Sequence, residues 1–206
     1  IKKAVRDTLD NKRVLFTCCN EELATFVKSK LAQYPKIDVL TYAELMKKHL
    51  GDVYDNLPTN PNGNKSCFEY MDQVPVEQKY DSIIVDEAQD FDIDMGLAVR
   101  SLLVDDSTSS LYVFYDKNQN VFEMDFENAF AIDAPPYVLR YNIRNTGSIY
   151  QCAVERTNLG HDTVANNIVG VHPEIHNYSK PSQAVKALSL IVNRLVQKEF
   201  VPAGSI

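Results

Sequence analysis

Ile83-Ile-Val-Asp-Glu-Ala-Gln-Asp-Phe91 is the stretch of the sequence that decides the fold. It begins with an apolar, β-branched run of the kind that forms a buried strand, and Asp86 and Glu87 follow where that strand ends. In open α/β sheets, ligands bind outside the carboxyl ends of the strands. The stretch therefore predicts an α/β fold with a candidate site at Asp86 and Glu87.

The two acidic residues have distinct chemical possibilities. Mg²⁺ prefers carboxylate and water oxygens, so Asp86 is a candidate ligand for a hydrated ion that bridges nucleotide phosphates. Glu87 is a candidate general base that polarises a water for in-line attack. The alternative is an acidic strand-to-helix turn in which Asp90 caps the next helix. Adjacent acids after such a strand are costly without a cation, and this favours the metal site.

Strands and helices alternate along the first part of the chain. Asn20 is expected to cap a helix whose first turn contains Glu21 and Glu22, and Gly51 is expected to end another helix. Such alternation predicts a parallel sheet with crossover helices. The expected strands are residues 13–18, 37–41, 82–86 and 111–115, and the expected helices are 21–31, 42–50 and 93–104.

Two segments interrupt this alternation. Residues 52–79 are rich in Pro, Gly and Asn, which predicts a loop-rich insertion with a short helix near Phe68–Met71. Pro135 and Pro136 form a candidate hinge, so we expect one domain over 1–134 and the beginning of a second over 135–206. In the second domain, strands are expected at 137–141 and 174–178, and helices from about 145 and over 182–199.

Two further motifs follow expected strands. After the strand at 111–115, Gln119 is a candidate sensor of a terminal phosphate or its attacking water, and Phe122 is a candidate for stacking on a base. Asp116 to Gln119 also has the composition of a simple turn. Past the hinge, Arg144 is a candidate arginine finger that contacts a γ-phosphate, the alternative being a surface salt bridge.

The order and spacing of these motifs resemble the UvrD/Rep group of superfamily 1 DNA helicases. The run DEAQD resembles the Walker B motif II of that family, YDKNQNVF resembles motif III (GDxxQxIY), and LRYNIR resembles motif IV (LxxNYR). Upstream, LFTCCN resembles motif Ia (TxTNxxA), with Ala24 also in place. VLTY resembles the short Thr-aromatic motif that touches the DNA backbone.

The resemblance implies a RecA-like P-loop NTPase sheet with flanking helices, part of a second RecA-like domain, and a motor that couples ATP hydrolysis to movement on single-stranded DNA. The choice between DNA and RNA stays open. The cofactors would be ATP and Mg²⁺. By the same resemblance Asp86 would hold Mg²⁺, and Glu87 would belong to the same metal site and act as general base. Gln119 would couple the γ-phosphate to DNA, and Arg144 would contact that phosphate. The residues expected to touch the nucleic acid are Asn20, Thr41 and Phe122.

The sequence also departs from the family pattern. The phosphate-cradling loop GxxxxGK(S/T) is absent and is expected just before Ile1, and motifs V and VI are expected beyond the last residue. Cys18 stands where the family often has a base-stacking Phe, and Tyr115 replaces a Gly. We therefore expect the chain alone to be inactive. The alternatives are a non-enzymatic interaction module with a degenerate helicase fold and a P-loop ATPase that does not unwind DNA.

Composition narrows the class of protein. The chain has 206 residues, of which 45% are hydrophobic and 24% charged, as in ordinary globular proteins. It has no apolar run of roughly 20 residues, so no membrane partner is expected. The net charge of −7 argues against coating nucleic acid by bulk electrostatics. Four cysteines without CxxC pairing predict free thiols, no zinc site and a cytoplasmic location.

Overall fold

The chain folds into two compact units in the computed structural model, which describes residues 1–60, 63–119, 126–157 and 163–206. Unit 1 is Ile1–Pro136 and unit 2 is Tyr137–Ile206, so the division falls directly after the double proline. Within the described ranges, no helix is both long enough and apolar enough to cross a membrane.

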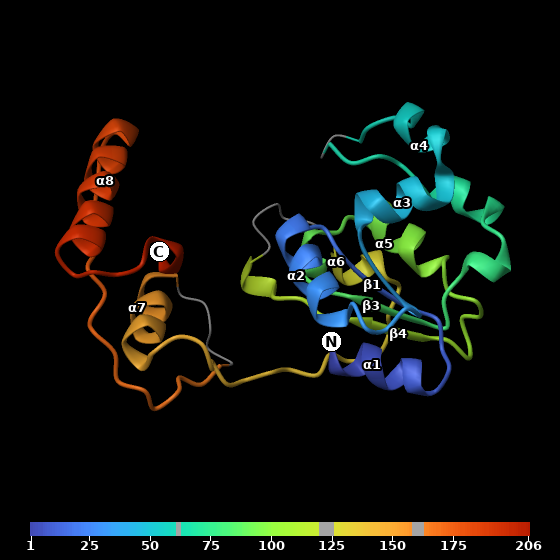
Figure 1. The fold of residues 1–206 in the computed structure, drawn as a ribbon, viewed down its shortest axis with the longest axis horizontal. Coiled ribbons are helices and arrows are strands. Elements are labelled where there is room, and N and C mark those ends of the chain that lie inside the picture. Colours follow the sequence, from blue (N-terminus) through green and yellow to red (C-terminus); the bar gives the residue numbers. More distant parts are fainter. Residues whose placement is uncertain (61–62, 120–125, 158–162) are drawn as a thin grey trace. The chain divides into compact units, whose positions relative to one another are not determined.

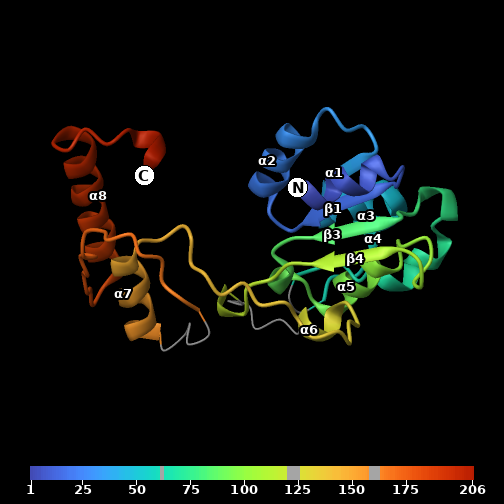
Figure 2. The same ribbon diagram turned by 90° about the horizontal axis from the view of Figure 1, so that it is seen from below.

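Unit 1 contains a four-stranded sheet in which every pairing is parallel (Figures 1 and 2). The strand order is β2-β1-β3-β4. The predicted α/β class is confirmed, and each strand lies within two residues of the bounds predicted from the sequence. The strands are β1 (Val14–Cys18), β2 (Ile37–Thr41), β3 (Ser82–Val85) and β4 (Ser110–Val113).

Helices cover both faces of the sheet, which explains why β1 and β3 are buried throughout and mostly apolar. Phe16 and Ile84 lie in the core that α1 and α2 cover, whereas Leu15 and Ile83 lie in the core on the opposite face, under α3 and α5. The short helix α6 contributes to the second core through Ala129. These helices are α1 (Lys2–Leu9), α2 (Glu21–Leu31), α3 (Tyr42–Leu50), α5 (Ile93–Arg100) and α6 (Phe126–Ala129).

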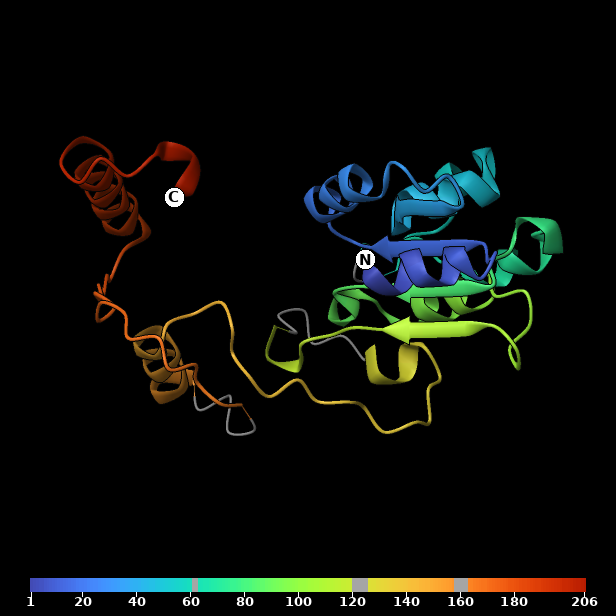
Figure 3. The same cartoon turned by 60° about the horizontal axis from the view of Figure 1, so that its bottom comes forward.

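Helix α1 runs antiparallel to the strands. The Ser82 hydroxyl, at the start of β3, donates a 2.7 Å hydrogen bond to the Asp7 carboxylate near the end of α1. Eight helical residues span about 12 Å, close to the length of a four-residue strand. The first turn of α1 therefore lies at the carboxyl edge of the sheet, and Figure 3 shows the N end of this dark-blue helix near the arrowheads of the strands.

The 52–79 insertion is fastened to the first turn of α5. Asp92 accepts 2.8 Å hydrogen bonds from the side-chain amides of Asn60 and Asn64, and Asp94 accepts one of the same length from the Cys67 N–H. The helix predicted near Phe68 is present as a 3₁₀ helix. The short helices of the insertion are α4 (Asp52–Asn56), η1 (Phe68–Gln73) and η2 (Val76–Gln78).

Unit 2 corrects two predictions made from the sequence. The strands expected at 137–141 and 174–178 are not formed: Tyr141 makes one isolated parallel bridge with Val164, and residues 174–178 lie in no strand. None of the side chains described in this unit is buried. The helices are α7 (Gly147–Thr157), α8 (Pro181–Gln197) and η5 (Ala203–Ser205).

Candidate functional site

The strand order of unit 1 defines a topological switch point between β1 and β3. The chain leaves β1 for β2 on one side of the sheet and leaves β3 for β4 on the other side. Open α/β sheets bind their ligands outside the carboxyl ends of strands that diverge in this way. The structure places Asp86 and Glu87 directly after β3, so both lie at this position.

Asp86 is half-buried at the end of β3. Its backbone N–H donates to the carbonyl of Thr17 on β1 (3.0 Å), and one carboxylate oxygen accepts from the Glu87 N–H (3.1 Å). Burial raises the pKa of Asp86 and the negative charge of Glu87 adds to this effect, while the hydrogen bond from the Glu87 N–H opposes it. A carboxylate in this environment would be stabilised by a nearby cation.

The first turn of α1 gives the same edge a complementary property. The helix dipole places partial positive charge at the N-terminal turn of α1, Lys2–Leu9. Uncapped N–H groups and the helix dipole favour anions at a helix N-terminus. A carboxylate suited to a cation and a helix end suited to an anion therefore lie at one edge of the sheet.

Glu87 has an unusual backbone conformation. Its φ of 53° and ψ of 46° lie in the left-handed region, which costs a residue with a side chain about 1–2 kcal/mol. Such strained residues cluster at functional sites. The carboxylate of Glu87 accepts a 2.6 Å hydrogen bond from the side-chain amide of Gln89, which is only 3% exposed. The turn continues as the 3₁₀ helix η3 (Ala88–Asp90).

Gln89 also reaches the end of β4. Its side-chain oxygen accepts the backbone N–H of Asp116 at 3.0 Å. The Asp116 carboxylate in turn accepts a 2.7 Å hydrogen bond from the side-chain amide of Gln119. The segment from Asp116 forms the turn that its composition indicates, as the 3₁₀ helix η4 (Lys117–Gln119). A continuous series of hydrogen bonds thus joins Glu87 to Gln119 through Gln89 and Asp116.

Sequence reasoning did not single out Gln89. The sequence did contain a signal, because Gln89 stands between the apolar residues Ala88 and Phe91. Both of these side chains are fully buried in the structure. A polar side chain in such surroundings needs hydrogen-bond partners. The sequence could therefore have indicated that Gln89 is engaged, but not with which groups.

The two predicted nucleic-acid contacts that the structure describes are both helix caps. Asn20 accepts the Leu23 N–H at 2.9 Å, which confirms the predicted cap of α2. Thr41 and Glu44 form a reciprocal capping box at α3, with bonds of 3.2 and 2.8 Å. A cavity of about 240 Å³ lies beside Thr41 and is also lined by Lys28. The nucleic-acid roles of Asn20 and Thr41 stay predictions, and Phe122 lies outside the described residues.

Arg144 lies in unit 2, in the bend that precedes α7. Its side chain is exposed and forms no ion pair or hydrogen bond with the parts of the chain that the structure describes. The surface salt bridge considered as an alternative is thus not observed. The guanidinium remains available for an external anion, and its role as an arginine finger stays a prediction.

Metal ligation by protein side chains alone has little support. Among the described residues, no group of three or more His, Cys, Asp and Glu side chains is placed to hold a metal ion. One or two carboxylates hold Mg²⁺ in proteins only together with other oxygen ligands, such as phosphate and water. The four cysteines are free, and burial raises the pKa of Cys18 to about 11, so this thiol is a poor nucleophile.

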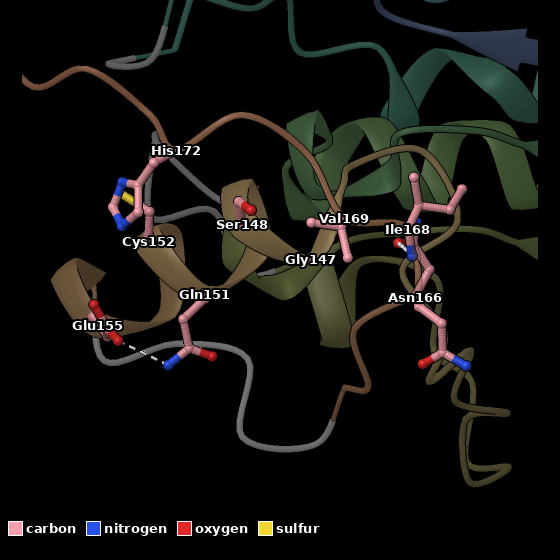
Figure 4. Close-up of a pocket in the computed structure, with 10 residues that line it drawn as sticks. Gly147, Ser148, Gln151, Cys152, Glu155, Asn166, Ile168, Val169 and His172 are labelled. Carbon is pink, nitrogen blue, oxygen red and sulfur yellow. Dashed lines mark hydrogen bonds between the residues drawn. The ribbon is translucent and has the colours of Figure 1, made fainter.

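Unit 2 has a cavity of about 420 Å³ between the start of α7 and the 166–172 segment (Figure 4). Several polar groups of its lining are already satisfied internally. The Ser148 hydroxyl donates to the Gly170 carbonyl at 2.8 Å, and the Gln151 amide donates to Glu155 at 2.7 Å. The cavity includes none of the site residues predicted from the sequence, so it does not extend the candidate site.

No protein-family model matches the chain, and no curated protein matches it. The assignment of the site therefore depends on the sequence motifs and on the geometry of the carboxyl edge.

Proposed function

We propose that this chain is part of an ATP-dependent motor of the UvrD/Rep-like superfamily 1 type, with a RecA-like sheet in unit 1. The observation that carries the proposal is the hydrogen-bonded series from Glu87 through Gln89 and Asp116 to Gln119, beside Asp86 at the switch point. Motifs that are about 30 residues apart in the sequence thus meet at one edge of the sheet, as a nucleotide-hydrolysing site requires.

The side chains divide the chemistry of phosphoryl transfer between them. Asp86 would hold a hydrated Mg²⁺, which neutralises the charge that develops on the phosphates. Glu87 would orient and deprotonate the attacking water, and its hydrogen bond from Gln89 fixes one carboxylate oxygen while the other can face that water. Gln119 would sense the terminal phosphate. Arg144, which belongs to unit 2, would contribute positive charge to the same phosphate.

The distribution of charge supports a local nucleic-acid contact despite the net charge of −7. Residues 1–50 contain ten Lys and Arg but only six Asp and Glu, whereas residues 51–130 contain four basic and seventeen acidic residues. Asn20 and Thr41 belong to the basic segment. A strand of DNA or RNA that contacts Asn20 would therefore lie against the more basic segment of the chain.

A non-enzymatic interaction module is the second candidate. Asn20 and Thr41 are both explained as helix caps without any ligand. Cys18, in the place of the stacking Phe, is fully buried and offers no surface to a base. These observations bear on nucleic-acid binding and leave the Glu87 to Gln119 series unexplained, so we prefer the motor.

The test uses the protein that the complete reading frame encodes. We expect ATP hydrolysis stimulated by single-stranded DNA, and a decrease in kcat of about 10²- to 10⁴-fold in Glu87→Gln, because a neutral amide cannot accept the proton of water. Glu77→Gln is the matched control, since Glu77 is exposed on η2. If Glu87→Gln hydrolyses ATP as fast as the wild type, Glu87 is not the general base.

Two further results would decide between the candidates. A motor of this type requires a GxxxxGK(S/T) loop in the same protein, and residues 1–206 contain none, so a full-length protein without this loop would contradict the motor. A wild-type protein that hydrolyses no ATP even with single-stranded DNA would favour the interaction module. Strand-displacement assays would identify an ATPase that does not unwind DNA.

A further inference from the structure

Gln89 is the one side chain that contacts both the turn after β3 and the end of β4 in the series described above. Its amide nitrogen lies 2.6 Å from a carboxylate oxygen of Glu87, and its amide oxygen lies 3.0 Å from the backbone nitrogen of Asp116. With 3% of its surface exposed, it has almost no contact with water. Both polar ends of the side chain are thus committed to protein partners.

These partners fix the orientation of the amide. If the group were turned over, its oxygen would face the Glu87 carboxylate and its NH₂ would face the Asp116 N–H, which leaves two repulsive contacts in a buried position. Only one orientation satisfies both partners. A displacement of the Asp116 turn would therefore act on the carboxylate of Glu87 through the Gln89 side chain, and the reverse holds equally.

Strand pairing does not require Gln89. The backbone already joins the two strand ends, since the Phe114 N–H donates to the Val85 carbonyl and the Ala88 N–H donates to the Phe114 carbonyl, both at 2.9 Å. The contacts of Gln89 are additional to this framework. Glu87, by contrast, has a left-handed backbone outside any strand or helix, so its carboxylate depends on a side-chain partner for its direction.

We propose that Gln89 is a positioning residue that aims the Glu87 carboxylate and couples it to the Asp116–Gln119 turn. The inference rests on the proposed function, in which Glu87 is the base and Gln119 the phosphate sensor. When Gln119 engages a phosphate, the strain on the turn passes through Asp116 and Gln89 and brings the base into line. Gln89 touches neither nucleotide nor water in this scheme and acts only through Glu87.

The test needs no nucleotide and uses the 206-residue chain. Backbone amide NMR spectra are compared for the wild type, Glu87→Ala, Gln89→Leu and the double variant. We expect Glu87→Ala to shift the Asp116 amide and the Gln119 side-chain amide in the wild-type background, and to leave both unshifted when Gln89 is Leu. Hydrogen exchange of the Asp116 amide should be faster in Gln89→Leu, because its acceptor is lost.

Controls separate coupling from misfolding. Gln33→Leu, at an exposed position after α2, should preserve the response of Asp116 to Glu87→Ala. If Gln89→Leu does not fold, Gln89→Asn replaces it, since a side chain one methylene shorter cannot reach both partners. An Asp116 response that is the same with and without Gln89 would overturn the proposal, and so would the absence of any response in the wild-type background.

The complete protein provides a second readout. There, Gln89→Leu should lower kcat for ATP hydrolysis with little change in KM, because ground-state binding of the nucleotide does not pass through Gln89. An equal kcat in Gln89→Leu and the wild type would contradict the inference even if Glu87→Gln is inactive. Coupling in the NMR experiment without any ATP hydrolysis would refute the motor function and leave the coupling intact.

Discussion

Glu87 shows how a backbone conformation can oppose stability at a candidate site. In the left-handed region, Gly avoids the steric cost that a Cβ brings, of about 1–2 kcal/mol. We predict that Glu87→Gly is more stable than Glu87→Ala by about 1 kcal/mol, measured by urea unfolding of unit 1. Both variants lose the bond from Gln89, so their difference isolates the backbone.

Asp86 provides the matched control for this prediction, since it is not among the residues with positive φ. There Gly should be less stable than Ala, because Gly loses more chain entropy on folding. The same sign at both positions would show that the left-handed conformation of Glu87 is not populated in solution. The sequence identifies the acids by their type and place, but it cannot reveal this conformation, which depends on how the turn meets β4.

His49 is predicted to make unit 1 sensitive to mild acid. Its buried ring nitrogens lack a hydrogen bond of good geometry among the described residues, and Gln78 offers only a weak side-chain contact. Burial lowers the pKa of His49 and the charges of Lys48 and Arg13 lower it further, while Gln78 and the charge of Asp38 oppose this shift without cancelling it. At about pH 7.5 and above the imidazole is almost entirely neutral in both the folded and the unfolded state. Below that pH the unfolded chain takes up the proton first, so stability falls as pH falls toward the folded pKa.

The urea concentration at the midpoint of unfolding of unit 1, measured at pH 7.5 and 5.5, tests whether stability falls as the pH falls. The wild type should lose stability between the two values, and His49→Gln should lose less because its amide does not titrate. His176→Gln, which removes an exposed imidazole, should keep the wild-type loss. Equal losses in wild type and His49→Gln would exclude His49 as the cause.

At the scale of one element, the N-terminus of α2 combines two roles that a single substitution can separate. Asn20 caps the helix through its side-chain oxygen, and its side-chain NH₂ donates to no described residue. Asn20→Asp keeps the capping oxygen but replaces the donor with negative charge. We predict that stability changes by less than about 0.5 kcal/mol while affinity for single-stranded DNA falls.

Asn20→Ala is the complementary variant, with an expected loss of about 1 kcal/mol of stability because the Leu23 N–H has no capping partner. Affinity is measured by fluorescence anisotropy with a labelled oligonucleotide at two salt concentrations, since electrostatic repulsion weakens in salt. If Asn20→Asp binds as tightly as the wild type at low salt, Asn20 is only a cap.

At the scale of the whole molecule, the sequence predicts the two units unequally well. In unit 1, strand-forming runs such as Val14–Cys18 lie beside partners from the same unit, so local pattern and tertiary pairing agree. In unit 2 the runs at 137–141 and 174–178 have the composition of strands, but no neighbouring strand among the described residues pairs with them. Strand formation is a pairwise event, and composition describes only one member of the pair.

The hydrogen-bonded series from Glu87 to Gln119 could be predicted only in part from the sequence. Both end residues were predicted, because each follows an apolar strand, and parallel strands bring their carboxyl ends to one edge. The link between them requires the register of β3 against β4, which pairs Val85 with Val113 and so sets Gln89 beside Asp116. Strand register is a property of the assembled sheet, and neither motif alone determines it.

The contrast in burial between the units predicts their relative stability. In unit 1 the strands β1 and β3 are buried throughout, whereas no described side chain of unit 2 is buried. On α8, Val185, Leu188 and Leu190 are more than 60% exposed. The apolar stripe of α8 that includes Ile191, Val192 and Leu195 is only half-buried, and a 17-residue helix with so little tertiary packing is only marginally stable in water.

Hydrogen exchange measured by mass spectrometry should therefore show the slowest amides in β1 and β3, and amides in α8 that exchange several orders of magnitude faster. Because both units are measured in one sample, each unit serves as an internal control for the other. Protection of α8 equal to that of β3 would mean that the apolar side chains around Leu188 are covered in solution. Since burial is what offsets the entropy of ordering a chain, fast exchange in α8 would locate nearly all of the stability of this molecule in the unit that contains Asp86 and Glu87.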